Sequence, residues 1–186
     1  ASLAQKVRFT REASFGRCGA RLLKELANHA GVMRSTPIST GLKDRLQWLI
    51  KYAAEARPRE LRTRLNPSPV VVFTDGASEE EVSVGGVMID GCRVEFFSDV
   101  VPGEVTQVWR CSGGRQVIGQ AELIPVLIGV SLWGEVLADR YSTWFLDQDA
   151  VRRGLMKGYS SSLRSGVIID LTADLMATVG TYPRFA

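Results

Sequence analysis

Three acidic residues occupy positions from which they could act together in catalysis. Asp75 follows a run of apolar residues, Glu122 lies near the start of an apolar helical stretch, and Asp147 ends the run Tyr141 to Leu146. Carboxylates held within a few ångströms raise one another's pKa unless a cation neutralises them. Because hard oxygen ligands favour Mg²⁺ or Mn²⁺, the three acids predict a divalent metal site.

The elements that must position these acids can be predicted from local pattern. The expected strands run from Val70 to Thr74, from Glu81 to Ile89, from Gly91 to Ser98 and from Tyr141 to Leu146. The expected helices begin near Gly119, at Asp149 and at Leu163, and the last two end at Lys157 and Val179. A long loop is expected from Pro102 to Gln116. This order predicts an α/β domain whose first three strands are antiparallel.

Two glycines, Gly85 and Gly86, interrupt the second expected strand. Glycine inside a strand marks either a bulge or a close approach by another part of the chain. Both interpretations stay open, and under the second the glycines leave room for a sugar-phosphate chain. In the loop that follows, a single Trp109 favours packing on the sheet over stacking on a base.

The segment Asn66-Pro67-Ser68-Pro69 divides the chain. Two prolines in four residues exclude a continuous helix and predict an extended linker. Before it, apolar residues at helical spacing predict two or three helices, of which the first runs from about Gly19 to Ala30 and the second from about Thr40 to Ala56. The predicted organisation is a helical region at 1–65, a linker at 66–69 and an α/β domain at 70–186.

Composition limits the functions open to the chain. The 186 residues are 45% hydrophobic and carry a formal net charge of +3, so one good core can form and a polyanionic partner is permitted but not required. The three cysteines lack zinc-binding spacing, which favours a reducing, intracellular compartment over a disulfide framework. The sequence has no long apolar run typical of a membrane span and no secretory signal pattern. The missing initiator Met predicts a fragment or a processed product.

The order strand-Asp, hairpin, helix-Glu, strand-Asp resembles the ribonuclease H fold. Three stretches of the sequence resemble motifs of this family. Phe73-Thr74-Asp75-Gly76-Ala77-Ser78 is similar to the motif of the first strand, and Gln120-Ala121-Glu122-Leu123 is similar to the motif of the helix. The third motif corresponds to Phe145-Leu146-Asp147-Gln148-Asp149-Ala150. Gln148 stands where the family usually has Asn, while the metal-binding acid is kept. The resemblance implies a mixed sheet with flanking helices, preceded by a small helical region.

A longer stretch resembles one branch of this family. Residues Asp147 to Ser160, with the turn Lys157-Gly158-Tyr159-Ser160, are similar to the ribonuclease H-like domains attached to reverse transcriptases of DIRS-type and related retroelements. Upstream, Val7-Arg8-Phe9 and Phe15-Gly16-Arg17 resemble the stretch between the polymerase thumb and the ribonuclease domain. The resemblance implies a connection region at 1–65 and a place in a polymerase polyprotein.

The same resemblance implies an endonuclease that cuts the RNA strand of RNA/DNA hybrids. Asp75, Glu122 and Asp147 would hold two Mg²⁺ or Mn²⁺ ions, one activating water and the other stabilising the leaving oxygen. Further residues are predicted to contact the 2′-hydroxyls and phosphates of the substrate, namely Gly76, Ala77, Ser78, Arg115 and Gln148.

One departure from the family leaves the activity open. The family usually supplies a fourth carboxylate or a histidine from a further strand and final helix, and both of these elements are predicted to be missing before Ala186. The three retained acids favour an active metal-dependent nuclease. The truncation favours a catalytically inactive subunit, structural or nucleic-acid-binding, in a larger assembly. A transposase- or integrase-like nuclease is a third hypothesis, disfavoured by the Glu122 helix between the two aspartates.

Overall fold

The computed structural model describes residues 19–32, 37–55, 66–111 and 117–186. The chain forms two compact units, Ala1–Leu61 and Arg62–Ala186. The elements that carry the predicted acids all belong to the second unit. None of the described helices has the length and apolar character needed to cross a bilayer.

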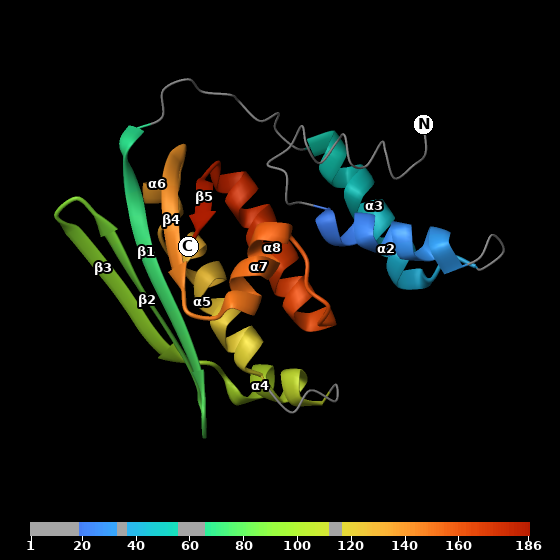
Figure 1. The fold of residues 1–186 in the computed structure, drawn as a ribbon, viewed down its shortest axis with the longest axis horizontal. Helices are drawn as coiled ribbons and strands as arrows, with labels where there is room; N and C mark the ends of the chain where they lie inside the picture. Colours follow the sequence, from blue (N-terminus) through green and yellow to red (C-terminus); the bar gives the residue numbers. More distant parts are fainter. Residues whose placement is uncertain (1–18, 33–36, 56–65, 112–116) are drawn as a thin grey trace. The chain divides into compact units, whose positions relative to one another are not determined.

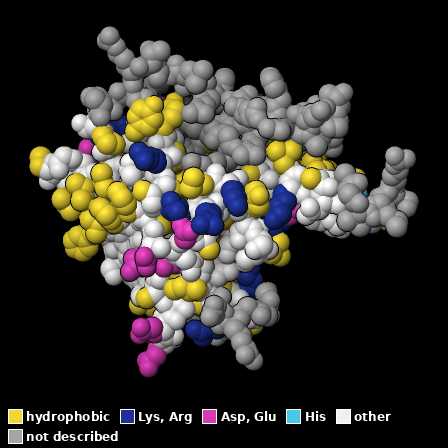
Figure 2. All heavy atoms as spheres, viewed as in Figure 1, with side chains coloured by type: hydrophobic (Ala, Val, Ile, Leu, Met, Phe, Trp, Pro, Cys, Tyr) yellow, Lys and Arg dark blue, Asp and Glu magenta, His cyan; other side chains and the backbone are white. Residues whose placement is uncertain are grey.

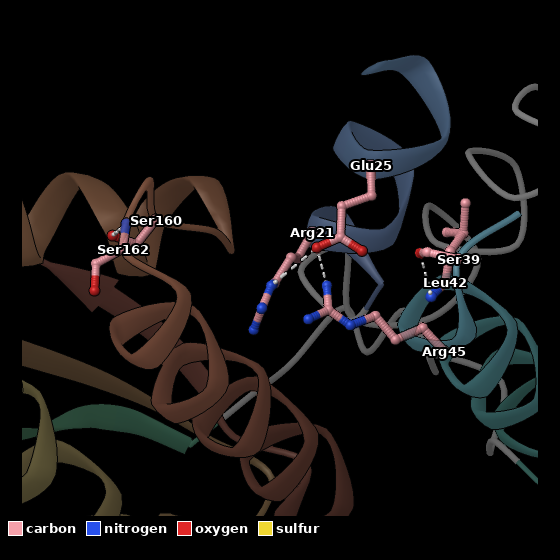
Figure 3. Close-up of polar contacts among 7 residues, drawn as sticks. All are labelled: Arg21, Glu25, Ser39, Leu42, Arg45, Ser160 and Ser162. Carbon is pink, nitrogen blue, oxygen red and sulfur yellow. Dashed lines mark hydrogen bonds and ion pairs between the residues drawn. The ribbon is translucent and has the colours of Figure 1, made fainter. Parts of the chain in front are cut away.

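The described residues of the first unit form the helices α2 (Ala20–Val32) and α3 (Thr40–Glu55), which confirms the two helices predicted in these ranges. Arg21 and Arg45 both pair with Glu25, so one carboxylate of α2 is shared by a residue of its own helix and a residue of α3 (Figure 3). The Ser39 hydroxyl accepts a hydrogen bond from the Leu42 backbone N–H at 3.3 Å and caps the start of α3.

The second unit is built on a five-stranded sheet with the order β3-β2-β1-β4-β5 (Figure 1). Its strands are β1 (Asn66–Ser78), β2 (Val82–Asp90), β3 (Arg93–Val100), β4 (Arg140–Leu146) and β5 (Tyr182–Phe185). The first three are antiparallel to their neighbours, whereas β4 is parallel to β1 and β5 is parallel to β4. This mixed sheet with helices after β3 and β4 confirms the predicted ribonuclease H-like α/β fold.

The predicted linker at 66–69 is wrong, because these residues form the first part of β1. Asn66 pairs with Arg140, and regular pairing with β4 resumes at Val70 after a register shift. Proline has no N–H to donate to a neighbouring strand, so Pro67 and Pro69 fall in this irregular stretch. The extended conformation was predicted correctly, but its pairing was not.

The predicted absence of a last strand is also wrong. Residues Tyr182–Phe185 form β5, and beyond them the Ala186 N–H donates to the Trp144 carbonyl at 2.8 Å. A four-residue strand that contains Pro183 gives almost no sequence signal. Proline is tolerated here because β5 lies at the edge of the sheet, where one side of the strand needs no partner.

The described residues of this unit also form five helices, which are α4 (Gly103–Arg110), α5 (Ile118–Leu132), α6 (Gly134–Leu137), α7 (Asp149–Lys157) and α8 (Leu163–Val179). The predicted bounds of α7 and α8 are confirmed, and each ends at a glycine with left-handed backbone, Gly158 and Gly180. A loop was predicted from Pro102 to Gln116, and this prediction is wrong for Gly103–Arg110, which form α4. Trp109 of α4 is buried, as its packing interpretation predicted.

The helices α5, α7 and α8 lie on one side of the sheet (Figure 1). Burial alternates accordingly along β1, where Val70 and Val72 are fully buried while Phe73 is exposed. Pairing between β1 and β2 runs without interruption through Gly85 and Gly86, which excludes the predicted bulge. A Cβ on Gly86 would lie 2.6 Å from the Phe97 ring, so this glycine makes room for an aromatic side chain.

Candidate active site

The register of β1 and β4 places two of the predicted acids side by side. Thr74 pairs with Leu146 on the last rung of the parallel ladder, so the next residues, Asp75 and Asp147, lie where the pairing of β1 with β4 ends. The expected end of the first strand at Thr74 is wrong, because β1 continues to Ser78 in its pairing with β2. Both carboxylates are exposed, and both line one hollow of about 660 Å³. The pairing of β1 with β4 therefore brings these two acids close together, as the sequence predicted.

Gly76 allows β1 to approach the first turn of α5. A Cβ at this position would lie 2.2 Å from the Ala121 carbonyl oxygen and 2.8 Å from the Glu122 nitrogen, distances that real side chains do not reach. Any other residue would push the strand and the helix apart. Gly76, predicted to contact substrate, is buried in this packing contact, and it is the residue that lets Glu122 lie close to Asp75.

Glu122 is a buried acid, and one of its two carboxylate oxygens is unsatisfied among the described residues. Its side chain is only 6% exposed, and its Oε2 atom has no hydrogen-bond partner among the described residues. Burial, which is the largest cause, and the negative charges of Asp75 and Asp147 together raise the pKa of Glu122 to about 7. The three predicted acids thus form one electrostatic group, in which the buried member is the one that resists ionisation.

Asp75, Glu122 and Asp147 fit a hard divalent cation chemically, because they supply carboxylate oxygens. One of these oxygens, Oε2 of Glu122, is buried and unsatisfied among the described residues. In the part of the chain that the structure describes, however, no three His, Cys, Asp or Glu side chains are grouped closely enough to hold one ion. The Asp75 Oδ1 atom accepts a hydrogen bond from the Gly76 N–H at 2.9 Å. The assignment of these acids as metal ligands therefore stays a prediction.

The other predicted contact residues lie around the same end of the sheet, with one exception. Ala77 is exposed and Ser78 is half-buried at the end of β1, and Gln148 directly follows Asp147 at the start of α7. Their contact with a substrate remains a prediction. Arg115 lies outside the described residues.

A buried polar contact behind the acids was not predicted. Gln120 is 7% exposed, and its Nε2 atom donates to the Ser165 hydroxyl of α8 at 3.3 Å, while its Oε1 atom has no partner among the described residues. This bond joins Gln120, the first residue of the Gln120-Ala121-Glu122 motif in the first turn of α5, to α8. A glutamine on the apolar side of a helix was the available sequence signal.

No protein-family model matches the chain, and no curated protein matches it. Among solved structures, the chain is similar to a ribonuclease H1 from the halophilic archaeon Halobacterium salinarum, with 19% identity, 63% of this chain and 82% of that chain covered, and a TM-score of 0.46. It is also similar to the N-terminal RNase H domain of Rv2228c from Mycobacterium tuberculosis, with 15% identity, 63% and 84% covered, and a TM-score of 0.48. At these identities the likeness concerns the fold alone, and the strand order of the chain itself remains the basis for calling that fold ribonuclease H-like.

Proposed function

We propose that the chain is a divalent-cation-dependent endonuclease that hydrolyses the RNA strand of RNA/DNA hybrids. The observation that supports this most strongly is the shared electrostatics of Asp75, Glu122 and Asp147 at one end of a ribonuclease H-like sheet. We further propose, from the sequence resemblance, that it forms part of a reverse transcriptase polyprotein of a DIRS-type or related retroelement, with 1–65 as its connection region.

In this proposal the three acids have different tasks. Asp75 and Asp147 are exposed at the hollow and would face the scissile phosphate together with the cations. Glu122 is buried and would add its charge only when a cation offsets the burial, and the repulsion by Asp75 and Asp147, that raise its pKa. When bound, Mg²⁺ or Mn²⁺ would supply an activated water and stabilise the leaving oxygen. Ala77, Ser78 and Gln148 would contact the sugar-phosphate chain nearby.

A second candidate is a catalytically inactive ribonuclease H-like subunit, structural or nucleic-acid-binding, within a larger assembly. Two observations favour it. The acids of the described residues are not grouped as ligands of one ion, and an oxygen of Asp75 is occupied by the Gly76 N–H. In such a subunit the acids would be retained without cleavage.

The two candidates differ in a direct assay. A labelled RNA/DNA hybrid is incubated with the chain and Mg²⁺ or Mn²⁺, and Asp75→Asn is compared with Glu135→Gln, which removes an exposed acid at the start of α6. The nuclease predicts cation-dependent cleavage that Asp75→Asn abolishes and Glu135→Gln retains. No cleavage by the folded native chain with either ion would overturn the nuclease and leave the inactive subunit.

A further inference from the structure

The two edge strands of the sheet differ in how well they are protected against pairing with a further strand. The strand β5 has four residues and contains Pro183, which has no N–H to donate. The strand β3 has eight residues and no proline, and no described strand pairs with its outer side. We call this outer side of Arg93–Val100 the β3 edge. It is the side of the sheet to which a further strand can add.

The hairpin determines which backbone groups of the β3 edge point outwards. Asp90 pairs with Arg93 across a tight turn, and residues that close such a turn exchange both of their hydrogen bonds. Pairs of this kind alternate along an antiparallel ladder with pairs that are not hydrogen-bonded. The residues in between, Val94, Phe96 and Ser98, therefore direct their N–H and C=O groups away from β2.

One hydrogen bond supports this assignment. Val100 is next in the same alternation, and its N–H donates to the Asp99 Oδ1 atom at 2.8 Å, as expected of a group that does not face β2. Figure 2 shows hydrophobic side chains gathered at the left of the view, where Figure 1 places β3. A long strand edge that is both unpaired and apolar is a template for pairing with another chain.

The charges along the β3 edge favour a second copy of this chain as the partner. A symmetric antiparallel pair that engages most of the strand has its axis at Phe96 or at Phe97. With Phe96 opposite Phe96, Arg93 of each copy faces Asp99 of the other, so opposite charges meet at both ends. With Phe97 opposite Phe97, Glu95 faces Asp99, so like charges meet at both ends. Opposite charges stabilise a pair of strands and like charges destabilise it.

We propose that two copies of this chain pair antiparallel through their β3 edges, with Phe96 opposite Phe96, and so join their sheets into one. The proposal goes beyond the nuclease function and does not depend on it, because it rests on the edge of a strand and on the charges along that edge.

The geometry of the strand allows Arg93 and Asp99 to meet across this contact. Both side chains are exposed, and both project from the same face of β3 because they are an even number of residues apart. They form a pair without hydrogen bonds, in which the side chains lie closer together. Arg93 already pairs with Glu95 of its own strand, and its guanidinium has further N–H donors for Asp99 of the second copy.

A hollow beside the β3 edge can receive a side chain of the second copy. It has a volume of about 440 Å³ and is lined by β3 residues and by Leu132 and Trp133 at the end of α5, but by none of the three predicted acids. In the proposed register, Phe97 of the second copy lies opposite Glu95, which lines this hollow. Leu132 is 60% exposed, and this ring would cover it.

The test is a charge swap in the full chain, followed by sedimentation equilibrium. The native chain should form a dimer that dissociates on dilution. Arg93→Asp and Asp99→Arg should each raise the dissociation constant by about tenfold or more, because each places like charges at both ends of the contact. An equimolar mixture of the two variants should form a heterodimer of native affinity, since each supplies the charge that the other lacks. Glu104→Arg, on an exposed position of α4, is the control and should change the dissociation constant by less than about twofold.

A second variant tests the backbone pairing itself. Ser98→Pro removes an N–H that points away from β2 and keeps every charge, so the chain should fold and fail to dimerise. Thermal melting of each variant checks folding.

Several results would overturn the proposal. They are a native chain that stays monomeric up to about 0.5 mM, well above a micromolar dissociation constant, a dimer that Ser98→Pro retains, and folded charge variants whose mixture stays monomeric. A monomeric native chain that binds an extended peptide of alternating valine and threonine, with the binding abolished by Ser98→Pro, would assign the β3 edge to another polypeptide instead.

Discussion

The two faces of the central sheet differ although the same strands build them. On the covered face, Val72 and Trp144 are fully buried beneath the helices, whereas on the other face, which we call the open face, their chain neighbours Phe73 and Phe145 are exposed. The covered face also buries the Glu122 carboxyl, while Asp75 and Asp147 remain in contact with solvent. Alternate residues of one strand thus differ in environment, because one set is buried beneath the helices and stabilises the fold, while the other set is exposed in the part of the chain that the structure describes.

The largest expected effect concerns an exposed acid. If the chain is a nuclease, Asp147→Asn should lower the rate of hybrid cleavage by about a thousandfold, because the exposed carboxylate would act on the reacting phosphate. The melting temperature should change little, since the side chain is exposed. Cleavage and thermal melting are measured on the same sample. A large loss of stability with this variant would contradict the separation between exposed acids and the buried core.

The next effect concerns packing against the covered face. Gly76→Ala should lower the free energy of unfolding by about 3 kcal/mol, because its methyl group collides with the Ala121 carbonyl. Gly103→Ala is the matched control, since a Cβ there meets no atom within 4 Å. Denaturant unfolding of both variants gives the comparison. Similar stabilities would show that β1 and α5 can separate without loss.

A smaller effect concerns pH. The folded-state pKa of Glu122, about 7, lies above its ordinary value of 4.5, so the folded chain holds a proton that the unfolded chain has released between these values. The free energy of unfolding should therefore fall as pH rises through this window, by about 2 kcal/mol. Glu122→Gln should remove this slope. Above the window, Mg²⁺ or Mn²⁺ should raise the melting temperature of the native chain more than that of Glu122→Gln.

The outcome that would contradict this view of Glu122 is an equal pH slope in both proteins. That result would mean that the carboxyl is solvated or paired in solution. Glu122→Gln could remove the pH dependence of the free energy of unfolding while neither ion changes the melting temperature of the native chain. Glu122 would then be a buried acid, but the support for a cation site would be lost.

The smallest effect should come from the open face itself. Phe96→Ala should change the free energy of unfolding by less than about 0.5 kcal/mol, because the ring is 79% exposed. Met88→Ala, on the fully buried side of the neighbouring strand, should cost about 3 kcal/mol. Thermal or denaturant unfolding of this pair measures the two faces directly. A large cost for Phe96→Ala would show that the open face is covered within the chain itself.

Sequence reasoning succeeded where one local signal was sufficient. The end of α7 followed from Gly158, which takes the left-handed backbone that glycine favours. The placement of Asp75 and Asp147 where the β1–β4 pairing ends followed from two apolar strands that each lead into an acid, although β1 continues past Asp75 to Ser78. Sequence reasoning failed for β5, where a short edge strand with a proline gives no pattern, and for α4, which begins directly after Pro102.

The open face could not have been predicted from the apolar run at Val70 to Phe73. Such a run is compatible with a strand buried on both sides, and which side is covered depends on helices far away in the sequence. The same limit applies to Glu122. Its position on a helix was predictable, but its buried and unsatisfied oxygen results from the close approach of β1 and α5 at Gly76.

The contact at Gly76 also bears on how natural variation at this end of the sheet should be interpreted. A substitution there is excluded on steric grounds whether or not the protein cuts nucleic acid, so invariance of this glycine among relatives would say nothing about activity. Asp75, one residue earlier, has an exposed side chain and no comparable steric constraint. In a mutational scan selected only for folded protein, position 76 should reject nearly every substitution and position 75 should accept many. Purifying selection on the acid beyond that folding baseline would then be the genetic signature of catalysis.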